Sequence, residues 1–458
     1  MAGQIYDQLR DAIAGGRLPP GARLTASRVL ATELGISRAT VADAYGRLVA
    51  EGYAHGRRGG GTLVAETPAS ASTAEGDVAA LYPTPEAAAL ERYGTALTSD
   101  ARYDLSAGRV DATLFPLKAW RRCVRDSLAD RDALRTYGEP GGSAELRQVL
   151  ARWITQSRGV VARPDQIVAT QGATQAIDLL GRTLLRPGDV AAVEEPGYPP
   201  AATILESQGI DVVGVPVDRS GLVVDELPAR AKLVYVTPSH QYPLGCVLTR
   251  GRRLALLNWA REHDAVIVED DYDSEFRHGR RPLEPLHRLD QTGRVVYVGT
   301  FSKVLSPSLR MGFMVAPRSL VPTLLALRQA ADFGPPKLMD AALTEFIAQG
   351  YLSRHLRKAR RTYTERHALL REELQRQAPT SVKALPAHAG LHVTLLAPNA
   401  PDDTELAARA AEHGLLVSTL RRTYRSSKPQ PGIVLGFGAL ATSDVPDAVC
   451  LLLNCLDE

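Results

Sequence analysis

Lysine is scarce in this sequence, in which seven lysines stand against 47 arginines. A reaction that needs a primary side-chain amine therefore has few candidates. One of them, Lys303, follows directly after the apolar run at residues 295–299, in the segment VVYVGTFSKVLSPSLRMGF. A side chain in that place projects into the crevice at the carboxyl edge of a parallel sheet. Alone it would be an ordinary solvated lysine, so its neighbours decide its role.

Two further predicted strands end in residues that complement an amine: Asp270 and Tyr272 after one, and Gly172, Ala173 and Thr174 after the other. The second group opens a helix whose free N–H groups suit a phosphate. Pyridoxal 5′-phosphate needs an amine for its aldehyde, an acid for its ring nitrogen, a hydroxyl for its ring oxygen and a phosphate cradle. The set predicts such a site, and the alternative is an acidic turn beside an ordinary helix start.

Alternating strands and helices must position these residues. Short β-branched runs, separated by longer helical patterns, occur at residues 166–170, 190–193, 211–215, 233–237, 265–269 and 295–299. The alternation predicts an α/β unit with a mostly parallel sheet covered by helices. From about Gly334 onward, arginine-rich helical stretches followed by LHVTLL and GIVLGFG predict a smaller C-terminal α+β unit.

The first 66 residues carry a different pattern of short helices. Residues 4–15 have helical spacing that stops at GGRLPPG, because proline lacks the backbone donor. Residues 26–34 predict a second helix with Val29, Leu30 and Leu34 on its inner face. After a turn at Gly35, Ser37 is expected to cap a third helix. Its expected inward residues are Val41, Tyr45, Leu48 and Val49.

A helix, a short turn and a second helix form the arrangement that enters the major groove of DNA. Ser37, Arg38 and Thr40 fall in the first turn of the third helix, where side chains and backbone donors meet phosphates and base edges. The following GYAHGRRGGGTLVA alternates like a two-stranded wing whose tip bears Arg57 and Arg58. Eight arginines against six acids in residues 1–66 are a modest basic footprint, so a helical protein-interaction domain is the alternative.

The run TPASASTAEGDVAA separates the two parts of the chain. Small and polar residues without an apolar period predict a flexible linker. We therefore expect a DNA-binding domain at residues 1–66, a linker at 67–92 and an effector and dimerisation domain at 93–458.

Composition excludes several classes of protein. No stretch approaches the roughly 20 apolar residues of a membrane span, and the N-terminus lacks the apolar core of a signal peptide. Four scattered cysteines without C-x-x-C spacing argue against a disulfide framework and a zinc site, so we expect a cytoplasmic protein without a metal. The net charge of +3 does not by itself require a polyanionic partner.

The N-terminal segment resembles the winged helix of the GntR regulators over nearly all of residues 4–65. The similar segments are IYDQLRDAIAGGRLPPGARL, ASRVLATELGISRATVADAYGRLVAEGY and GGGTLVA. The resemblance implies that Arg28, Ser37, Arg38, Thr40 and the wing near residues 59–61 approach double-stranded DNA. Thr25 stands where the family usually has proline.

The larger part resembles the fold-type I aminotransferase domain of the MocR/GabR subfamily of GntR regulators, over about 350 residues. The similar segments are DLSAGRVDATLFPLKAW, YGEPGGSAELR, EEPGYPP, VTPSHQYPLG, EDDYDSEF and GTFSKVLSPSLRMGF. The resemblance implies that Lys303 forms the internal aldimine, that Asp270 pairs with the pyridinium nitrogen and that Tyr272 donates to the ring oxygen. It also implies that Tyr198 stacks on the ring and that a neighbouring subunit's phosphate is reached by Tyr137. The implied phosphate-binding residues are Gly172, Ala173, Thr174, Ser302 and Arg310.

Two positions depart from true aminotransferases of this type. Tyr242, in PSHQYPLG, stands where an asparagine normally touches the ring oxygen, and Val434 stands where an arginine grips the substrate carboxylate. The regulatory subfamily tends to share both changes, which favours a sensor over a turnover enzyme. A carboxylate effector still needs a cation, for which Arg422 and Arg425 are the candidates.

The leading hypothesis is a homodimeric, DNA-binding regulator that senses pyridoxal phosphate, alone or joined to an amine or amino-acid effector. Family habit suggests genes of vitamin B6 or of amino-acid and amine metabolism as targets. An aminotransferase with a DNA-binding appendage is the alternative from another class. A repressor whose large domain only dimerises is the third.

Overall fold

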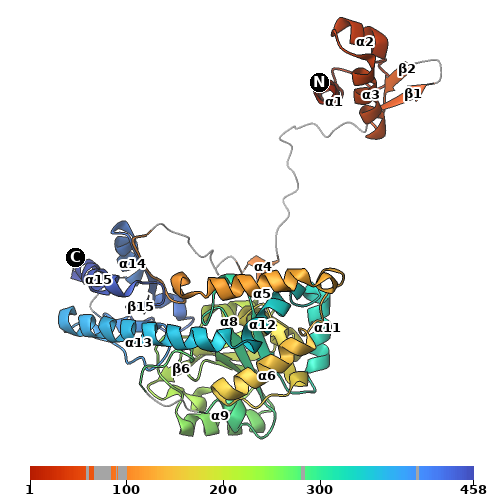
Figure 1. Cartoon of the computed structure of the whole chain (residues 1–458). Helices are drawn as coiled ribbons and strands as arrows, with labels where there is room; N and C mark the ends of the chain where they lie inside the picture. The colour runs from red at the N-terminus through yellow and green to blue at the C-terminus, as the bar shows by residue number, and fades with distance from the viewer. Residues whose placement is uncertain are drawn as a thin grey trace. The chain divides into compact units, whose positions relative to one another are not determined.

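The computed structural model describes residues 1–57, 61–66, 84–88, 90, 101–279, 284–398 and 402–457. The chain divides into two compact units, Met1–Tyr82 and Pro83–Glu458 (Figure 1). That division lies within the stretch expected to be a linker, most of which lies outside the described residues, as do Arg58 and the tip of the wing. In the described part of the chain, no helix combines the length and apolar character needed to cross a bilayer.

The small unit is a three-helix bundle with a hairpin. Its elements are α1 (Ala2–Ala14), α2 (Ser27–Glu33), α3 (Arg38–Ala50), β1 (Ala54–Arg57) and β2 (Gly61–Val64), and the two strands pair antiparallel. Val41 and Leu48 of α3 are fully buried, and Tyr45 is nearly so. Ser37 caps α3, because its side-chain oxygen accepts a hydrogen bond from the Thr40 N–H at 3.1 Å. The predicted helices and wing strands are thus present.

The prediction of which residues face the core in α2 and α3 was partly wrong. Val29, Leu34 and Val49 expose 42%, 51% and 43% of their surface. Helix α2 packs through Leu30 and the buried Ala31 instead. A helix turns by about 100° per residue, so a face centred between positions 30 and 31 turns position 29 away from the core.

The large unit contains an eight-stranded sheet. In spatial order its strands are β4 (Ile167–Thr170), β11 (Gly312–Val315), β10 (Val295–Thr300), β9 (Val266–Asp271), β8 (Ala231–Val236), β5 (Val190–Glu195), β6 (Asp211–Asp218) and β7 (Gly221–Leu222). From β10 to β6 all neighbours are parallel, whereas β11 and β7 pair antiparallel. All six predicted strands lie in this sheet, which is mostly parallel as expected.

Helices cover both faces of the large sheet. Ala191 and Val193 of β5 pack with α7 (Ala173–Leu184), α8 (Pro199–Glu206) and α11 (Val321–Asp332). Alternate residues of β5 pack with α9 (Arg250–Glu262) and α10 (Leu286–Leu289) on the other face. Strands buried on both faces are continuously apolar, which is why their sequence runs lacked a polar alternation.

The remaining helices are α4 (Pro85–Ala88), α5 (Leu117–Ala129), α6 (Ala144–Arg158), α12 (Lys337–Ala348), α13 (Tyr351–Gln377), α14 (Asp403–Glu412) and α15 (Val445–Asp457). The long α13 extends from α12 to the C-terminal helix α15, with which it packs (Figure 1).

A second sheet has the order β12 (Lys383–Ala384), β13 (His392–Leu396), β15 (Gly432–Gly436), β14 (Leu415–Thr419) and β3 (Tyr103–Leu105). The C-terminal α+β unit was predicted to begin near Gly334, but β3 comes from the start of the large unit and pairs parallel with β14. The predicted C-terminal unit therefore lacked one of its strands. A pairing between strands some 300 residues apart leaves no local pattern in the sequence.

The cap of α3 can be tested by replacing Ser37. In Ser37→Ala, the Thr40 N–H loses its acceptor, and we expect the free energy of unfolding of the small unit to fall by about 1 kcal/mol. Ser37→Asp keeps an acceptor at the same place and should retain near wild-type stability. Denaturant unfolding monitored by circular dichroism, without DNA, measures both. Equal stability of Ser37→Ala and wild type would contradict the cap.

Candidate cofactor site

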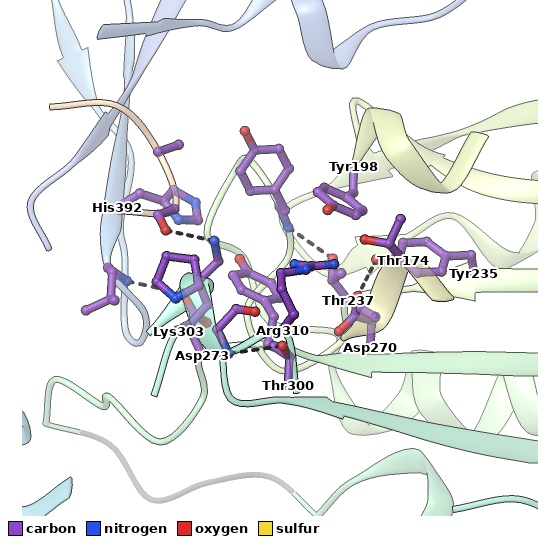
Figure 2. A pocket seen from close by; sticks show the side chains of 18 residues that line it. Thr174, Tyr198, Tyr235, Thr237, Asp270, Asp273, Thr300, Lys303, Arg310 and His392 are labelled. Atoms are coloured by element: carbon purple, nitrogen blue, oxygen red, sulfur yellow. Dashed lines mark hydrogen bonds between the residues drawn. The ribbon is translucent and has the colours of Figure 1, made fainter. Parts of the chain in front are cut away.

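The carboxyl ends of the parallel strands surround a cavity of about 190 Å³ (Figure 2). Strand β9 ends at Asp271, β10 ends at Thr300 and β4 ends at Thr170, and the turns that follow these strands form much of its wall. Of the ten residues predicted to bind a cofactor, eight line it: Ala173, Thr174, Tyr198, Asp270, Tyr272, Ser302, Lys303 and Arg310.

Lys303 places its amine inside this cavity. Its Nζ donates to the carbonyl oxygen of Gly108 at 2.8 Å, and burial lowers the pKa of the amine. A lowered pKa increases the fraction of neutral, nucleophilic amine. Gly108 has φ +88°, and a Cβ there would lie 2.6 Å from Nζ. No sequence pattern marked this glycine, which the close approach of the carbonyl to the amine requires.

Asp270 offers one engaged and one bare oxygen. Its Oδ2 accepts a hydrogen bond from the Tyr235 hydroxyl at 2.6 Å, whereas Oδ1 is buried without a partner among the described residues. Burial raises the pKa of Asp270 to about 7. A bare carboxylate oxygen in a dry wall calls for a cation or a donor, such as the protonated ring nitrogen of pyridoxal phosphate. Tyr235 lies in the strand predicted at residues 233–237 and was not among the predicted site residues.

The start of α7 supplies the predicted anion cradle. Gly172 precedes the helix with φ +89°, and a Cβ there would lie 3.5 Å from the Arg310 guanidinium. Arg310 itself has the left-handed φ of +48° and donates to the carbonyl oxygen of Gln171 at 2.8 Å. Backbone N–H groups at a helix start, next to an arginine, fit the charge and donors that a phosphate requires.

Aromatic side chains close the cavity. The rings of Tyr198 and Tyr235 lie nearly parallel with their centres 6.4 Å apart, and Tyr242 meets Tyr198 edge to face at 6.0 Å. Burial raises the pKa of Tyr242 to about 12, so this phenol stays protonated. The tyrosine that replaces the asparagine of aminotransferases therefore lies in the wall, as its place in the motif implied.

Three predicted residues lie away from this wall. Tyr137 is 77% exposed and stacks on Phe333 with ring centres 4.6 Å apart. Arg425 points its guanidinium to the Val212 carbonyl oxygen and the Glu206 carboxylate, and Arg422 is exposed. Within the described part of this unit, the two arginines are therefore not placed to meet a ligand in the cavity.

Glu195 explains the position of the Arg425 segment. Although burial raises its pKa, hydrogen bonds from the N–H groups of Ser427, Arg425 and Ser426 outweigh it and lower the pKa to about 2. The hydroxyl groups of Ser426 and Ser427 also donate to this carboxylate, each at 2.8 Å. The loop before β15 is thus held against the end of β5. No local sequence pattern indicates a contact between segments so far apart in the chain.

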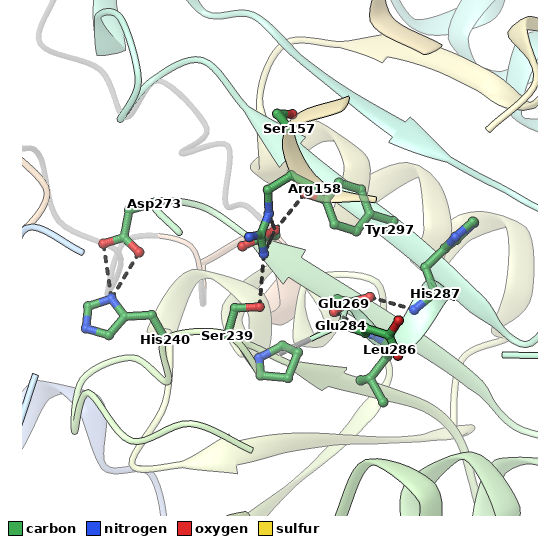
Figure 3. A network of polar contacts seen from close by, with 12 residues as sticks. Ser157, Arg158, Ser239, His240, Glu269, Asp273, Glu284, Leu286, His287 and Tyr297 are labelled. Carbon is green, nitrogen blue, oxygen red and sulfur yellow. Dashed lines mark hydrogen bonds and ion pairs between the residues drawn. The ribbon is translucent and has the colours of Figure 1, made fainter. Parts of the chain in front are cut away.

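Buried charged and polar side chains around Arg158 form a network of contacts (Figure 3). Arg158 donates through Nε to Asp271 at 2.6 Å and through Nη2 to Ser239 at 3.2 Å, and the Tyr297 hydroxyl donates to Asp271 at 2.7 Å. Burial raises the pKa of Asp271, but the Arg158 guanidinium together with hydrogen bonds from Ser274 and Tyr297 lowers it overall. These residues lie far apart in sequence, so no local signal pairs them.

His240, Asp273 and His392 form a second buried cluster, whose potential ligand atoms all lie within 4.8 Å of one another. His240 Nδ1 lies 3.0 Å from Asp273, and the His392 Nε2 lies 3.0 Å from the Pro243 carbonyl oxygen. Both histidines and the aspartate are therefore already engaged in hydrogen bonds within the protein. None of the three was predicted to belong to the site.

The predicted DNA-contact residues lie in the small unit. Arg28 is exposed on α2, Arg38 is exposed in the first turn of α3, and Arg57 is exposed at the end of β1. The side-chain hydroxyl groups of Ser37 and Thr40 are hydrogen-bonded to each other at 2.8 Å, next to Arg38 in the sequence. Their role in DNA binding remains a prediction.

The raised pKa of Asp270 can be tested by Asp270→Asn. Below about pH 4 this carboxyl is protonated in both the folded and the unfolded chain, whereas between about pH 4 and 7 only the unfolded chain loses the proton. The cofactor-free wild type should therefore lose stability, relative to the variant, as the pH rises to about 7. At pH 8 we expect Asp270→Asn to have gained on the order of 4 kcal/mol over the wild type relative to their difference below pH 4. Thermal melts at pH 4.5 and 8 measure this, and a constant difference would contradict it.

Comparisons with known proteins agree with both units. Residues 1–64 match the family of bacterial regulatory proteins, gntR family, and residues 103–427 match aminotransferase class I and II. The chain is 36% identical to the probable rhizopine catabolism regulatory protein MocR of Rhizobium meliloti, over 95% of this chain and 90% of that protein. It is 34% identical to the pyridoxine biosynthesis transcriptional regulator PdxR of Corynebacterium glutamicum, over 98% and 96%.

Solved structures similar to the large unit include aminotransferases. The kynurenine aminotransferase of Pyrococcus horikoshii matches with a TM-score of 0.73 and 28% identity, over 79% of this chain and 91% of that one. An archaeal alanine:glyoxylate aminotransferase matches with a TM-score of 0.74 and 29% identity, over 81% and 93%. The predicted fold class and cofactor are confirmed. The chain belongs to the MocR-type regulators of the GntR family, and it is a pyridoxal phosphate-binding transcription regulator that joins a winged helix to an aminotransferase-like domain.

Proposed function

We propose that the aminotransferase-like domain senses pyridoxal phosphate, alone or together with an amine effector, and thereby changes the affinity of the winged helix for its operator. The observation that carries the proposal is the Lys303 amine in one cavity with the bare Oδ1 of Asp270 and the cradle at Arg310. When bound, the cofactor supplies an aldehyde that reacts with primary amines. Lys303 holds this aldehyde, Asp270 keeps the ring nitrogen protonated, and Tyr198 covers the ring.

The proposal favours sensing over turnover. Val434, at the place of the substrate-binding arginine of aminotransferases, is fully buried in β15, opposite Thr394 and Ser418. Tyr242 occupies the wall where those enzymes carry an asparagine. A site that keeps the lysine and loses the grip on an α-carboxylate retains cofactor binding and weakens the orientation of a substrate.

Sensing requires coupling between the two units. A ligand shifts an equilibrium only by its difference in affinity for the two states, so occupied and empty cavities must favour different arrangements of the winged helices. We propose a homodimer, in which the exposed Tyr137 reaches the phosphate of the partner subunit's site. Genes of vitamin B6 or amine metabolism are the proposed targets, since their products are the ligands of such a site.

Lys303→Ala tests the sensor. We expect the visible absorption band that pyridoxal phosphate develops on the wild-type protein to be lost, because no amine remains to condense with the aldehyde. The response of DNA affinity to the cofactor should be lost as well. Lys232→Ala is the matched control, since this lysine is also on the large sheet but pairs with Asp189 at the surface. Spectra and gel shifts measure both, and an unchanged DNA response in Lys303→Ala would overturn sensing.

Arg38→Ala tests the DNA surface. If Arg38 contacts a base edge, its loss should weaken operator binding by about 1–3 kcal/mol, and loss of a phosphate contact should lower the salt dependence of the affinity. Arg10→Ala is the control, because Arg10 is partly exposed on α1 and pairs with Asp7 and Asp11. Fluorescence anisotropy at several salt concentrations measures both. Equal effects of the two variants would place the DNA surface elsewhere.

Removing residues 1–66 separates the regulator from the aminotransferase alternative. An enzyme with an accessory DNA-binding domain should keep multiple turnovers with an amino donor and a keto acid after the deletion. A regulator should bind the cofactor without sustained turnover, with or without these residues. Product formation beyond one equivalent per site, in both forms, would favour the enzyme.

A further inference from the structure

Next to Tyr272 in the cavity wall, the buried carboxylate of Asp273 contacts a buried histidine, His240. Both carboxylate oxygens of Asp273 lie close to Nδ1 of His240, at 3.0 and 3.2 Å, and both residues are 2% exposed. The same carboxylate accepts from the backbone N–H of Leu391 at 3.2 Å. A carboxylate can only accept hydrogen bonds, so this contact assigns the hydrogen to Nδ1 of His240.

The phenol of Tyr272 shares this nitrogen. Its hydroxyl oxygen lies 3.1 Å from Nδ1 of His240. Since Nδ1 carries one hydrogen, which it directs to Asp273, the Tyr272 oxygen can share that hydrogen but cannot donate to Nδ1, and the hydroxyl hydrogen is left for another acceptor. Tyr272 lines the cavity, whereas His240 is not part of the wall. The histidine therefore acts through the tyrosine and not directly on a ligand.

The chain backbone is shaped around this pair. Gly390 has φ +81°, and a Cβ there would lie 2.1 Å from the His240 ring and 2.4 Å from Asp273. On its other side, the His240 ring packs against His392 with ring centres 4.5 Å apart. His392 Nε2 donates to the Pro243 carbonyl oxygen, so this second imidazole is also fixed in direction.

We propose that Asp273 and His240 are positioning residues that hold the Tyr272 hydroxyl as a donor toward the ring oxygen of the cofactor. The proposal rests on the cofactor site described above and adds two residues to it. Asp273 keeps the hydrogen on Nδ1 of His240. That nitrogen therefore cannot accept a hydrogen bond from the Tyr272 hydroxyl, which is left to donate toward the cavity. Accepting a hydrogen bond also strengthens the one that the hydroxyl donates.

The conservative variant Asp273→Asn distinguishes this role from simple electrostatics. The N–H of Leu391 orients the asparagine oxygen toward itself, so the asparagine NH2 faces His240 and moves the imidazole hydrogen to Nε2. Nδ1 then accepts from Tyr272 and withdraws the hydroxyl from the cofactor. Loss of a donor to the ring oxygen destabilises its negatively charged form, which raises the pH at which the visible cofactor band titrates. Loss of the Asp273 charge alone would disfavour the protonated form and lower that pH.

The experiment is a pH titration of the visible band of the full-length, cofactor-loaded protein. We expect the midpoint to rise by about one pH unit in Tyr272→Phe and in Asp273→Asn, the size expected for a hydrogen bond to a charged acceptor. His240→Phe, whose ring keeps the packing against His392, should give a smaller rise. In the His240→Phe background, Asp273→Asn should no longer raise the midpoint, because its effect passes through the imidazole.

Melting temperatures and cofactor affinity establish that each variant is folded and has bound the cofactor. If Asp273→Asn fails to fold or to bind the cofactor, His240→Phe alone tests the proposal. A midpoint that stays unchanged or falls in both Asp273→Asn and His240→Phe overturns the proposal. A rise from Asp273→Asn that persists in the His240→Phe background does so too. These failures differ from failure of the cofactor site itself, in which the wild type would develop no visible band.

Discussion

The carboxyl group of Asp270 is the constraint around which the large unit is arranged. It is the penultimate residue of the central strand β9, one of its oxygens accepts a hydrogen bond from Tyr235, and the other is buried without a partner within the described structure. A fully buried carboxylate is costly unless a cation or donor completes it. The cavity next to it therefore favours a ligand with a positively charged or protonated atom at that place, which the ring nitrogen of pyridoxal phosphate supplies.

The neighbouring carboxyl groups of Asp270 and Asp271 have pKa values shifted in opposite directions by their different surroundings. Burial raises the pKa of Asp270 to about 7, whereas the Arg158 guanidinium holds the neighbouring Asp271 below its ordinary pKa. Two consecutive carboxyls thus serve different purposes: Asp271 anchors a helix to the sheet, and Asp270 is left for a ligand. Alternate residues of a strand point to opposite faces, which allows adjacent positions to meet such different partners.

Close backbone approaches complete the site. Gly108 lets its carbonyl reach the Lys303 amine, Gly172 leaves room beside Arg310, and Gly390 lets the chain pass the His240 and Asp273 pair. All three glycines have positive φ, so a side chain would bring strain as well as a clash at the closest of these contacts. The cavity is consequently shaped by absent side chains as much as by those that line it.

The amino-acid sequence alone was enough to predict the class of the fold, six of the eight strands of the large sheet, the helices and wing strands of the small unit, and eight of the 18 residues in the cavity wall. Each of these leaves a local signal: an apolar run, a cap such as Ser37, or a polar residue such as Lys303 directly after a strand. Tertiary structure alone decided the pairing of β3 with β14, the partners of Arg425, the contact of Arg158 with Asp271, and the separate contact of His240 with Asp273. These contacts join residues tens to hundreds of positions apart, and their geometry exists only once the sheet has brought the strand ends together.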